Sequence, residues 1–311
     1  YISDAVLAEE LGFTRSWYGE HHFRPCQWTG SPMLVASAVA ARTERLRVGT
    51  AVTLLSFHHP IRTAEDAAAA DIISGGRFDL GVGPGSQYEE FRSFGIDPAT
   101  MNQRTWESLD WIRRAFTEPG EFSHHGKFYD IPNMTFTTKP VQEPLPIWWG
   151  GMGPLNQKRA AERGLNFIGP FNHGGYNEAL RNAGRNPQDH EVALMVMVCV
   201  ADSTEKAWDI AGPGLEYHVN FYETRRDLKG ELPPPEHAVT AEKLRAGEAG
   251  FWTAFVGTPD EVIAGLRPLA EGAMGRLTQF ACQMRHPGMS TKDTHRSMRL
   301  FAEHVIPALN G

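Results

Sequence analysis

The sequence predicts an α/β fold, a (β/α)8 or TIM barrel with insertions, and three observations support this prediction. Short apolar runs typical of strands alternate with amphipathic or alanine-rich runs typical of helices along most of the 311 residues. No shift in composition marks a linker between two domains. Polar and glycine-rich clusters follow several predicted strands, which is where such a barrel places its active site. A doubly wound open sheet is the structural alternative that the sequence leaves open.

The predicted elements follow from apolar periodicity and from the residues that begin and end each run. Helices are predicted at residues 5–11, 31–41, 60–73, 104–116, 154–163, 176–183, 204–222, 259–269 and 291–308. Strands are predicted in the run before residue 20 and at residues 45–55, 77–82, 146–149, 165–169, 192–200 and 276–282. One more strand would complete a barrel of eight. We therefore expect the first barrel strand to precede Tyr1 and to be missing from this numbering.

Individual residues account for several of these boundaries. Ser31 suits the N-cap position and Pro32 the first position of the second helix. The pair Gly75-Gly76 ends the third helix. Gly49 lies inside a predicted strand, where we expect it to mark a bulge. The run at 192–200 is continuously apolar, which is the form expected of a strand covered on both faces.

Two segments interrupt the alternation of helices and strands. Residues 120–140 contain paired β-like runs separated by turn residues, so we expect a hairpin excursion there. Residues 227–250 contain three consecutive prolines and no clear period, which predicts a long loop or insertion. We expect this insertion to act as a mobile lid over the barrel mouth. The whole chain, residues 1–311, is predicted to form one domain.

Composition excludes several classes of function. The net charge of −7 gives no electrostatic reason to bind nucleic acid or an anionic membrane. No apolar run approaches the ~20 residues of a membrane-spanning helix. The three cysteines, Cys26, Cys199 and Cys282, are odd in number and far apart, so neither a disulfide framework nor a zinc site is indicated. Adjacent histidines on a strand point to opposite faces, so no metal site is predicted. We expect a cytoplasmic protein.

Proton-exchanging side chains follow the first predicted strand. Glu20, His21 and His22 end a short aromatic run, and histidine can accept or donate a proton near neutral pH. One of these histidines could instead be a core residue and the other a solvated loop residue. A second cluster, residues 83–90, follows the strand at 77–82 and combines glycines with polar side chains.

A glycine-rich loop opens a helix in the middle of the chain. Gly151, Met152 and Gly153 lie in this loop, and Asn156 lies in the first turn of the helix. Backbone N–H groups at a helix N-terminus, made approachable by glycine, can bind a phosphate. The same glycines could serve only the dihedral angles of a tight turn. The glycines around Pro84 do not form a dinucleotide fingerprint, because the spacing is wrong and no helix is expected directly after them.

Taken together, these features resemble the bacterial luciferase-like flavin monooxygenase family. The matching residues run in the family's order over almost the whole chain. They are Ala8-Glu9-Glu10-Leu11-Gly12-Phe13 before Glu20-His21-His22-Phe23, then Arg47-Val48-Gly49-Thr50-Ala51-Val52, His59-Pro60-Ile61-Arg62, Glu65-Asp66, Ser74-Gly75-Gly76-Arg77-Phe78, Phe91-Arg92-Ser93-Phe94-Gly95 and Val256-Gly257-Thr258-Pro259. Each match is weak alone, but the set is specific for the superfamily.

The resemblance implies an enzyme that uses reduced FMN and O2 to oxygenate a hydrophobic organic substrate. A separate NAD(P)H-dependent flavin reductase would supply the reduced flavin, and the protein is expected to form a homodimer. His21 matches the family's catalytic histidine. The bond between Ala51 and Val52 matches a non-proline cis peptide bond beneath the isoalloxazine ring. The implied cofactor-binding residues are Ala51, Val52, Gly83, Gly85, Gly151, Met152, Gly153 and Asn156.

One position departs from the family pattern. Pro84 stands where many relatives carry an arginine that grips the flavin phosphate. Phosphate binding would then depend more on Met152, Gly153 and Asn156, without a charged bidentate contact. The departure keeps the deazaflavin F420 as an alternative cofactor, and an F420-dependent oxidoreductase as an alternative function. A non-catalytic luciferase-like partner subunit is a further alternative.

The substrate pocket is expected to involve Glu20, His22, Trp28 and Tyr88, since aromatic and polar side chains near strand ends are typical of such pockets. His21 and His22 should point to opposite sides of their strand end. The resemblance assigns the pocket side to His21. Glu20 could orient an imidazole by accepting its other N–H, although the sequence does not say which one.

Overall fold

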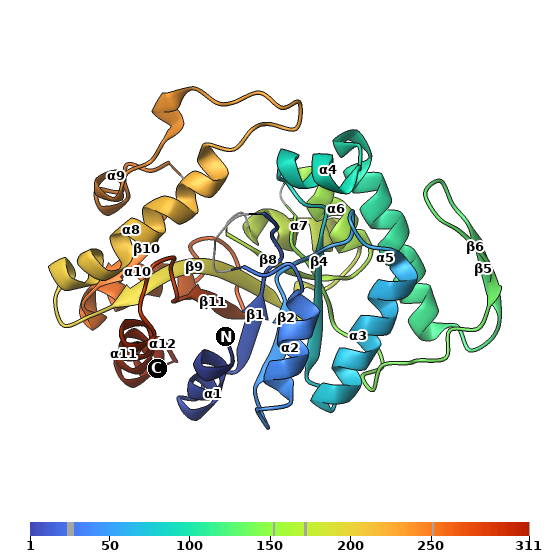
Figure 1. The fold of residues 1–311 in the computed structure, drawn as a ribbon. Helices are drawn as coiled ribbons and strands as arrows, with labels where there is room; N and C mark the ends of the chain where they lie inside the picture. Colours follow the sequence, from blue (N-terminus) through green and yellow to red (C-terminus); the bar gives the residue numbers. More distant parts are fainter. Residues whose placement is uncertain (24–27, 152, 171–172, 251, 311) are drawn as a thin grey trace. The chain divides into compact units, whose positions relative to one another are not determined.

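Parallel strands alternate with helices in the computed structural model, which describes residues 1–23, 28–151, 153–170, 173–250 and 252–310 (Figure 1). The predicted α/β fold with a parallel sheet is confirmed. The chain divides into two compact units, one formed mostly by residues 28–151 and the other mostly by residues 152–311. Of the N-terminal segment, residues 1–5 and 14–23 belong to the first unit and residues 6–13 to the second.

The first unit contains a parallel sheet whose strand order follows the chain. In order, its strands are β1 (Arg15–Tyr18), β2 (Arg47–Thr50), β4 (Phe78–Gly83) and β7 (Ile147–Trp149), and β3 (Thr53–Leu54) also pairs with β4. The single strand predicted at 45–55 is therefore two strands, separated at residues 51–52. The C-terminal ends of these parallel strands place the loops after β1, β3 and β4 together.

Gly49 does not form the predicted bulge. It pairs in regular register with Trp17 of β1 and Asp79 of β4. A Cβ atom at this position would lie 2.5 Å from the Trp17 ring and 2.8 Å from the Asp79 carbonyl oxygen. Contacts this short are not tolerated in folded proteins, so Gly49 is needed to make room for the indole of Trp17 on the sheet.

Helices connect the strands of the first unit. They are α1 (Ile2–Glu10), which precedes β1, then α2 (Pro32–Ala40), α3 (Pro60–Ser74), α4 (Tyr88–Phe94) and α5 (Met101–Thr117), with a 3₁₀ turn at Pro98–Thr100. Ser31 occupies the N-cap position of α2 but makes no side-chain cap bond, so Pro32 is the residue that defines this start. Gly75 ends α3 in the left-handed region, with φ 63°, as predicted.

The helix α4 is not among the predicted helices. Pro84 and Gly85 end β4, and Gly85 has φ 84°, but the chain becomes helical again at Tyr88. The helix has 7 residues and ends at Gly95, which has φ 69°. A helix this short gives too few apolar repeats for its period to be recognised in the sequence.

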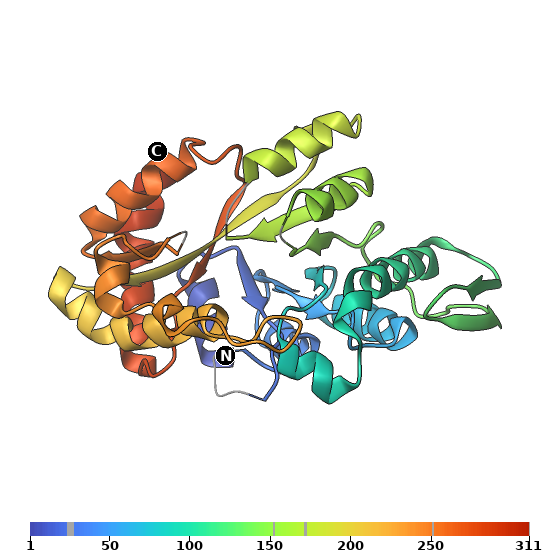
Figure 2. The ribbon, with the colours of Figure 1, turned by 90° about the horizontal axis from the view of Figure 1, so that it is seen from above.

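The predicted hairpin is present in the first unit as an antiparallel pair. It joins β5 (Phe122–His125) to β6 (Asp130–Met134), and Figures 1 and 2 show it beyond α5 at the edge of this unit. Glu107 of α5 accepts the backbone N–H groups of residues 127–129 and also contacts His124 Nε2, at 3.2 Å. This single carboxylate therefore ties the hairpin turn to α5.

The second unit is built around one long parallel strand. Its strands are β8 (Asn166–Gly169), β9 (Val192–Val200), β10 (Ala254–Gly257) and β11 (Gln279–Gln283), and the other three all pair in parallel with β9. Its helices are α6 (Pro154–Glu162), α7 (His173–Asn182), α8 (Thr204–Glu223), α9 (Ala241–Arg245), α10 (Pro259–Ala270), α11 (Thr291–Leu300) and α12 (Ile306–Asn310). Figure 2 shows β9 running between the helices of this unit.

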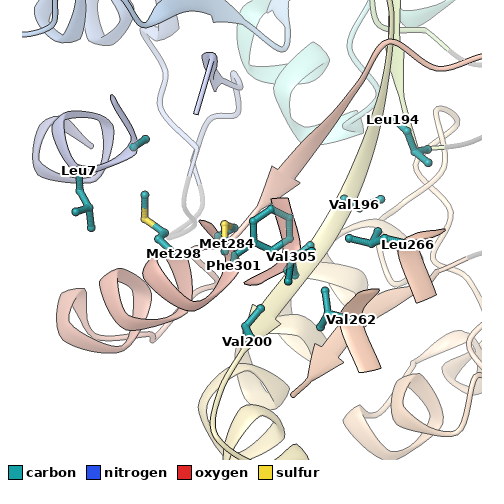
Figure 3. Packing of buried hydrophobic residues seen from close by; sticks show 12 residues of the cluster. Leu7, Leu194, Val196, Val200, Val262, Leu266, Met284, Met298, Phe301 and Val305 are labelled. Atoms are coloured by element: carbon teal, nitrogen blue, oxygen red, sulfur yellow. The ribbon is translucent and has the colours of Figure 1, made fainter. Parts of the chain in front are cut away.

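The two faces of β9 are both buried, which confirms the interpretation of its continuous apolar run. Leu194, Val196, Val198 and Val200 share one face and pack in a cluster with residues of α10 and of the C-terminal helices (Figure 3). Met197 and Cys199 face the opposite cluster, which contains residues of α8. Alternate residues of a strand point to opposite faces, so each face builds its own core.

Three further differences from the predicted elements lie in the second unit. The strand β10 is not among the predicted strands. The insertion at 227–250 contains a 3₁₀ turn (Pro235–His237) and the helix α9. The C-terminal helical run passes through a π-helical segment (Phe301–Val305) between α11 and α12. The boundaries of the remaining predicted elements agree within a few residues.

The single-domain organisation of residues 1–311 stays a prediction. Among the described residues, no helix combines the length and the apolar character needed to cross a lipid bilayer.

Candidate active site

Two buried carboxylates organise the loops that follow β1 and β4. Glu90, in the first turn of α4, is 1% exposed, and its Oε1 lies 3.0 Å from His21 Nδ1. The same oxygen accepts the backbone N–H of His22 at 2.8 Å. Glu90 therefore fixes both the ring of His21 and the backbone that carries it. The contact joins residues 69 positions apart in the sequence.

Glu20 is the second carboxylate, and it collects two other imidazoles. Its Oε1 lies 2.9 Å from His22 Nε2 and 2.7 Å from His58 Nε2. Its Oε2 accepts the backbone N–H of Leu54 at 2.9 Å, which ties the end of β1 to β3. The sequence left open which imidazole Glu20 orients. The structure shows that it contacts His22 and His58, whereas Glu90 contacts His21.

The environment of Glu20 favours its charged form. Burial on its own raises the pKa of this carboxyl, but the hydrogen bonds from His22, His58 and the Leu54 amide outweigh burial and lower the pKa. Burial likewise lowers the pKa of His58, while the hydrogen bond and the charge of Glu20 raise it by more, so the net shift is upward. The contact between Glu20 and His58 thus contributes to both pKa shifts, as expected of an ion pair.

Aromatic rings surround the two histidines of the loop after β1. The indole of Trp28 packs edge-on against His21, with ring centroids 4.7 Å apart. His22 packs against Phe94 of α4, at 4.9 Å, and against Phe57, at 6.3 Å. The two rings have different carboxylate partners and different aromatic neighbours. These partners agree with the expectation that the histidines point in different directions, while their roles stay a prediction.

The peptide bond between Ala51 and Val52 is cis, as the resemblance implied. Val52 lies against three glycines of neighbouring strands. A Cβ atom on Gly150 would lie 2.4 Å from Val52 Cγ1, and one on Gly83 would lie 2.7 Å from Val52 Cγ2. The same atom on Gly81 would fall 3.5 Å from Val52 Cγ1. The ends of β4 and β7 thus lack side chains where Val52 packs, and the backbone there is close to this side chain.

The opposite end of the same strands carries a different kind of cluster. Asp79 of β4 is fully buried and accepts hydrogen bonds from Arg47 of β2 at 2.9 and 3.0 Å, and Arg15 Nε of β1 lies 3.0 Å away. Trp148 of β7 also donates to it, at 3.3 Å. Polar residues at the N-terminal ends of barrel strands serve stability, whereas those at the C-terminal ends carry chemistry. The Asp79 cluster is therefore structural.

The predicted phosphate loop is described only in part. Gly151 ends the first unit, Met152 lies outside the described residues, and Gly153 is the N-cap of α6 with φ 90°. Nothing lies within 4 Å of the position that a Gly153 Cβ would take, so the backbone there is open to approach. Asn156 lies in the first turn of α6. The geometry suits a bound phosphate, and the φ of Gly153 also requires glycine.

The predicted pocket residues lie in two settings. Trp28 and Tyr88 are partly exposed, Tyr88 at the start of α4. Glu20, in contrast, has a fully buried side chain whose two oxygens are occupied by internal hydrogen bonds. It shapes the cluster from within. Gly85, the remaining predicted cofactor contact, lies in the loop after β4, and a Cβ there would touch Phe57 and Phe91 at 3.5 and 3.4 Å.

Three residues of the cluster are absent from the predicted set. They are Glu90, His58 and Gln87, the last a buried side chain just before α4. Glu90 and Gln87 lie in the glycine-rich segment 83–90 that the sequence does single out, so their position after a strand was a usable signal. His58 lies after β3, whose separation from β2 the sequence does not indicate. No group of three or more His, Cys, Asp or Glu side chains in the described ranges has the geometry of metal ligands.

Known proteins are similar in sequence to this chain over almost its whole length. The luciferase-like monooxygenase family matches residues 3–275. The 4-hydroxyprotoasukamycin monooxygenase of Streptomyces nodosus subsp. asukaensis is 32% identical over 331 residues, covering 99% of this chain and 86% of that protein. The oxygenase component of the flavin-dependent trigonelline monooxygenase of Acinetobacter baylyi is 28% identical, covering 98% of this chain and 88% of that protein.

A solved structure gives the same result. The crystal structure of monooxygenase RslO1 from Streptomyces bottropensis superposes with a TM-score of 0.82 at 26% identity, covering 98% of this chain and 93% of that one. The family match over residues 3–275, the 32% identity to a relative covered over 86% of its length and the structural superposition agree with one another. On this basis the chain belongs to the luciferase-like monooxygenase family.

Proposed function

We propose that the chain is the oxygenase component of a two-component system, which uses reduced FMN and O2 to insert one oxygen atom into an organic substrate. Membership of the monooxygenase family supports an oxidoreductase activity. The relative named as an oxygenase component supports a separate flavin reductase as the partner that supplies reduced flavin. The observation that carries the proposal is the pairing of His21 with the buried carboxylate of Glu90.

Each compact unit, taken by itself, has residues that fit a part of FMN. In the second unit, the first turn of α6 follows Gly153 and contains Asn156, which suits a phosphate. In the first unit, the glycines around Val52 leave backbone without side chains at the ends of β4 and β7, which suits a flat ring system. Bound reduced FMN would supply the two electrons with which one atom of O2 enters the substrate and the other becomes water.

The residues of the cluster supply proton transfer at a fixed position. Glu90 accepts from Nδ1 of His21 and so sets the tautomer with the proton on that nitrogen. His21 then exchanges protons with the substrate through Nε2, which such a tautomer leaves as an acceptor. A carboxylate in this position also stabilises the imidazolium once Nε2 has taken up a proton. The Trp28 ring against His21 restrains its orientation and excludes water from one side.

Direct binding of reduced cofactors tests the proposal. We expect the purified protein to bind reduced FMN under anaerobic conditions more tightly than reduced F420, and to consume O2 when an organic substrate and reduced FMN are both present. Tighter binding of reduced F420 would indicate that the protein is an F420-dependent oxidoreductase and not an FMN-dependent monooxygenase. Binding of reduced FMN with no substrate-dependent O2 consumption across a broad panel would indicate a non-catalytic subunit.

A pair of variants tests the phosphate site. A bulky residue at Gly153 is a poor test, because φ 90° strains any residue that has a Cβ. Asn156→Ala keeps the turn and removes the side chain that would contact the phosphate. We expect it to weaken binding of FMN while leaving binding of riboflavin, which lacks the phosphate, unchanged. Equal loss for FMN and riboflavin, or no loss for either, would show that Asn156 does not contact the phosphate.

A further inference from the structure

Gln87 has a side chain that the fold itself does not use. It lies just before α4 in the loop that follows β4, and the residue is 2% exposed. Neither its Nε2 nor its Oε1 has a hydrogen-bond partner among the described residues. A buried carboxamide with both polar ends unpaired opposes folding, and an apolar side chain of similar size would be more stable there. A partner that is bound only during function explains why glutamine is present.

The position of Gln87 in α4 does not account for its side chain. Its backbone carbonyl accepts from the N–H groups of Glu90 and Phe91, but its side chain makes no cap bond. Glutamine is also not among the residues preferred at this position. Three residues later, where a carboxylate commonly folds back toward the N-cap, Glu90 turns to His21 and His22 instead. Neither Gln87 nor Glu90 therefore uses its side chain to cap α4.

Glu90, three residues later in the chain, carries a further unpaired oxygen. Its Oε1 is occupied by His21 and His22, but its Oε2 is buried and has no partner in the described part of the chain. Gln87, just before α4, and Glu90, in its first turn, therefore contribute an amide donor, an amide acceptor and a carboxylate oxygen, all buried. The Gln87 carboxamide is neutral and can both donate and accept, so it matches a neutral group that does the same.

We propose that Gln87 is a specificity residue, which binds a neutral group of the substrate that both donates and accepts a hydrogen bond, such as a phenolic hydroxyl or an amide. The inference rests on the proposed function, because it places this group beside the oxygenation site. It narrows the expected hydrophobic substrate to one that is apolar in most of its surface but polar near the reacting carbon. A site built around a hydrogen bond discriminates strongly against analogues that lack it, since its buried groups are then left unpaired.

The test compares two probe molecules that differ in one hydroxyl. Binding of 1-naphthol and of naphthalene is measured by calorimetry or by ligand-observed NMR, without flavin, for wild type and for Gln87→Met. Methionine has a similar volume and no polar end. We expect wild type to bind 1-naphthol at least 10-fold more tightly than naphthalene, and Gln87→Met to lose this preference. The melting temperature of Gln87→Met should equal or exceed that of wild type, because two unpaired groups are removed.

Matched measurements separate this inference from its alternatives. Gln103→Met, at an exposed glutamine of α5, makes the same chemical change away from the cluster and should keep the preference. Absence of a preference in wild type, or its persistence in Gln87→Met, overturns the proposal. If Gln87→Met instead weakens binding of reduced FMN, the contact belongs to the flavin and the substrate assignment is wrong. Failure of the oxygenase function would appear only in the flavin and O2 experiments, so the two failures are distinguishable.

Discussion

His21 and Glu90 show how one carboxylate can fix the position of a proposed catalytic side chain. Glu90 accepts from both the ring of His21 and the backbone of His22, so the ring and its support are fixed together. Such a double contact restrains an imidazole in position and in tautomer. Glu90 is 1% exposed, so solvent does not compete for this contact.

We expect His21→Ala to keep the fold and most of the affinity for reduced FMN, but to lower turnover about 100-fold or more, the usual size of a general acid–base contribution. Glu90→Gln keeps a hydrogen-bonding oxygen but removes the charge, so it should lower turnover less and shift the pH profile of turnover. Stopped-flow and steady-state O2 consumption would measure both. His22→Ala should act mainly on stability. Loss of turnover in His22→Ala with full turnover in His21→Ala would reverse the assignment.

The Glu20–His58 pair makes stability depend on pH in two directions. The pKa of His58 is raised, so its contribution is complete at low pH and is lost as pH rises through the folded-state pKa, above 6.5. The pKa of Glu20 is lowered, so its contribution is present above 4.5 and is lost as pH falls below that value. The pair therefore stabilises the fold most between these limits.

His58→Gln should reveal this dependence. We expect the difference in free energy of unfolding between wild type and His58→Gln, measured with urea, to be largest in mildly acidic solution and to shrink as pH rises through the raised pKa of His58. His125 provides the control, because it lies 2.6 Å from Asp130 but both side chains are more than 70% exposed. His125→Gln should show almost no pH-dependent difference. A difference for His58→Gln that stays flat from pH 5.5 to 9 would contradict the ion pair.

At the scale of single residues, the sequence predicted only those members of the cluster that are adjacent in the chain. Glu20, His21 and His22 stand together, so their common position at a strand end follows from the alternation of elements. The carboxylate that holds His21 is 69 residues away, and its reach depends on where α4 begins. Two glutamates precede Phe91, and no rule of spacing selects Glu90 over Glu89. Side-chain pairing across loops is a tertiary property that the local pattern does not contain.

At the scale of elements, Val52 and the glycines of β4 and β7 form a mutually dependent packing unit. The three atoms nearest to a Gly150 Cβ all belong to Val52. A Cβ at Gly83, in contrast, would also meet the carbonyl oxygen of Gly150 at 2.7 Å, a backbone atom that cannot turn aside. The two glycines therefore differ in whether a smaller neighbour can relieve their substitution.

A double-mutant cycle tests this difference. Gly150→Ala should destabilise the fold by about 1–3 kcal/mol, as overpacking typically does, and Val52→Ala in the same chain should recover most of that loss. Gly83→Ala should be destabilising both alone and combined with Val52→Ala. Urea unfolding followed by circular dichroism gives the four free energies. Equal coupling to Val52 for both glycines would show that the backbone contact at Gly83 does not matter.

The two ends of the strands in the first unit should respond oppositely to substitution. Asp79 lies at the N-terminal end, buried between two arginines, and Asp79→Asn would leave their charges without a buried partner. We expect a loss of about 3–5 kcal/mol in unfolding free energy, with unchanged turnover per folded molecule. Asp202→Asn is the control, because its pairs with Lys206 and Arg296 are half-exposed, and it should cost far less than Asp79→Asn. A similar cost for both would remove the distinction.

The sequence predicted long, strongly patterned elements well and short ones poorly. The run of β9 is apolar on both faces, and its two clusters in the second unit explain why. The helix α4 and the strand β10 have 7 and 4 residues, too few for a period to appear. The separation of β2 from β3 lies within a run that is uniformly favourable for strand, so only the backbone geometry at Ala51 and Val52 distinguishes it.

At the scale of the whole molecule, the insertion at 227–250 shows what composition alone could and could not indicate. Its second half is packed on α8: Asn220 exchanges two hydrogen bonds with Val239, and Leu244 is 4% exposed within a core cluster of the second unit. Its first residues form a tight turn in which Asp227 accepts the N–H groups of Lys229 and Glu231. The proline-rich middle, at residues 231–237, is largely exposed, as are residues 245–248 at the end of α9 and just after it.

We narrow the lid predicted from the sequence to the proline-rich residues 231–237, and limited proteolysis can test it. Proteinase K should cut first in this segment, since the flanking turn and α9 are held by internal hydrogen bonds and burial. Reduced FMN together with 1-naphthol should slow that cut several-fold if the segment closes over bound ligand. The hairpin turn at 126–128 is the internal control. Glu107 accepts the backbone N–H groups of residues 127–129, so the cutting rate at this turn should not change with ligand. Equal rates at 231–237 with and without ligand would leave this segment as an exposed loop with no part in closure.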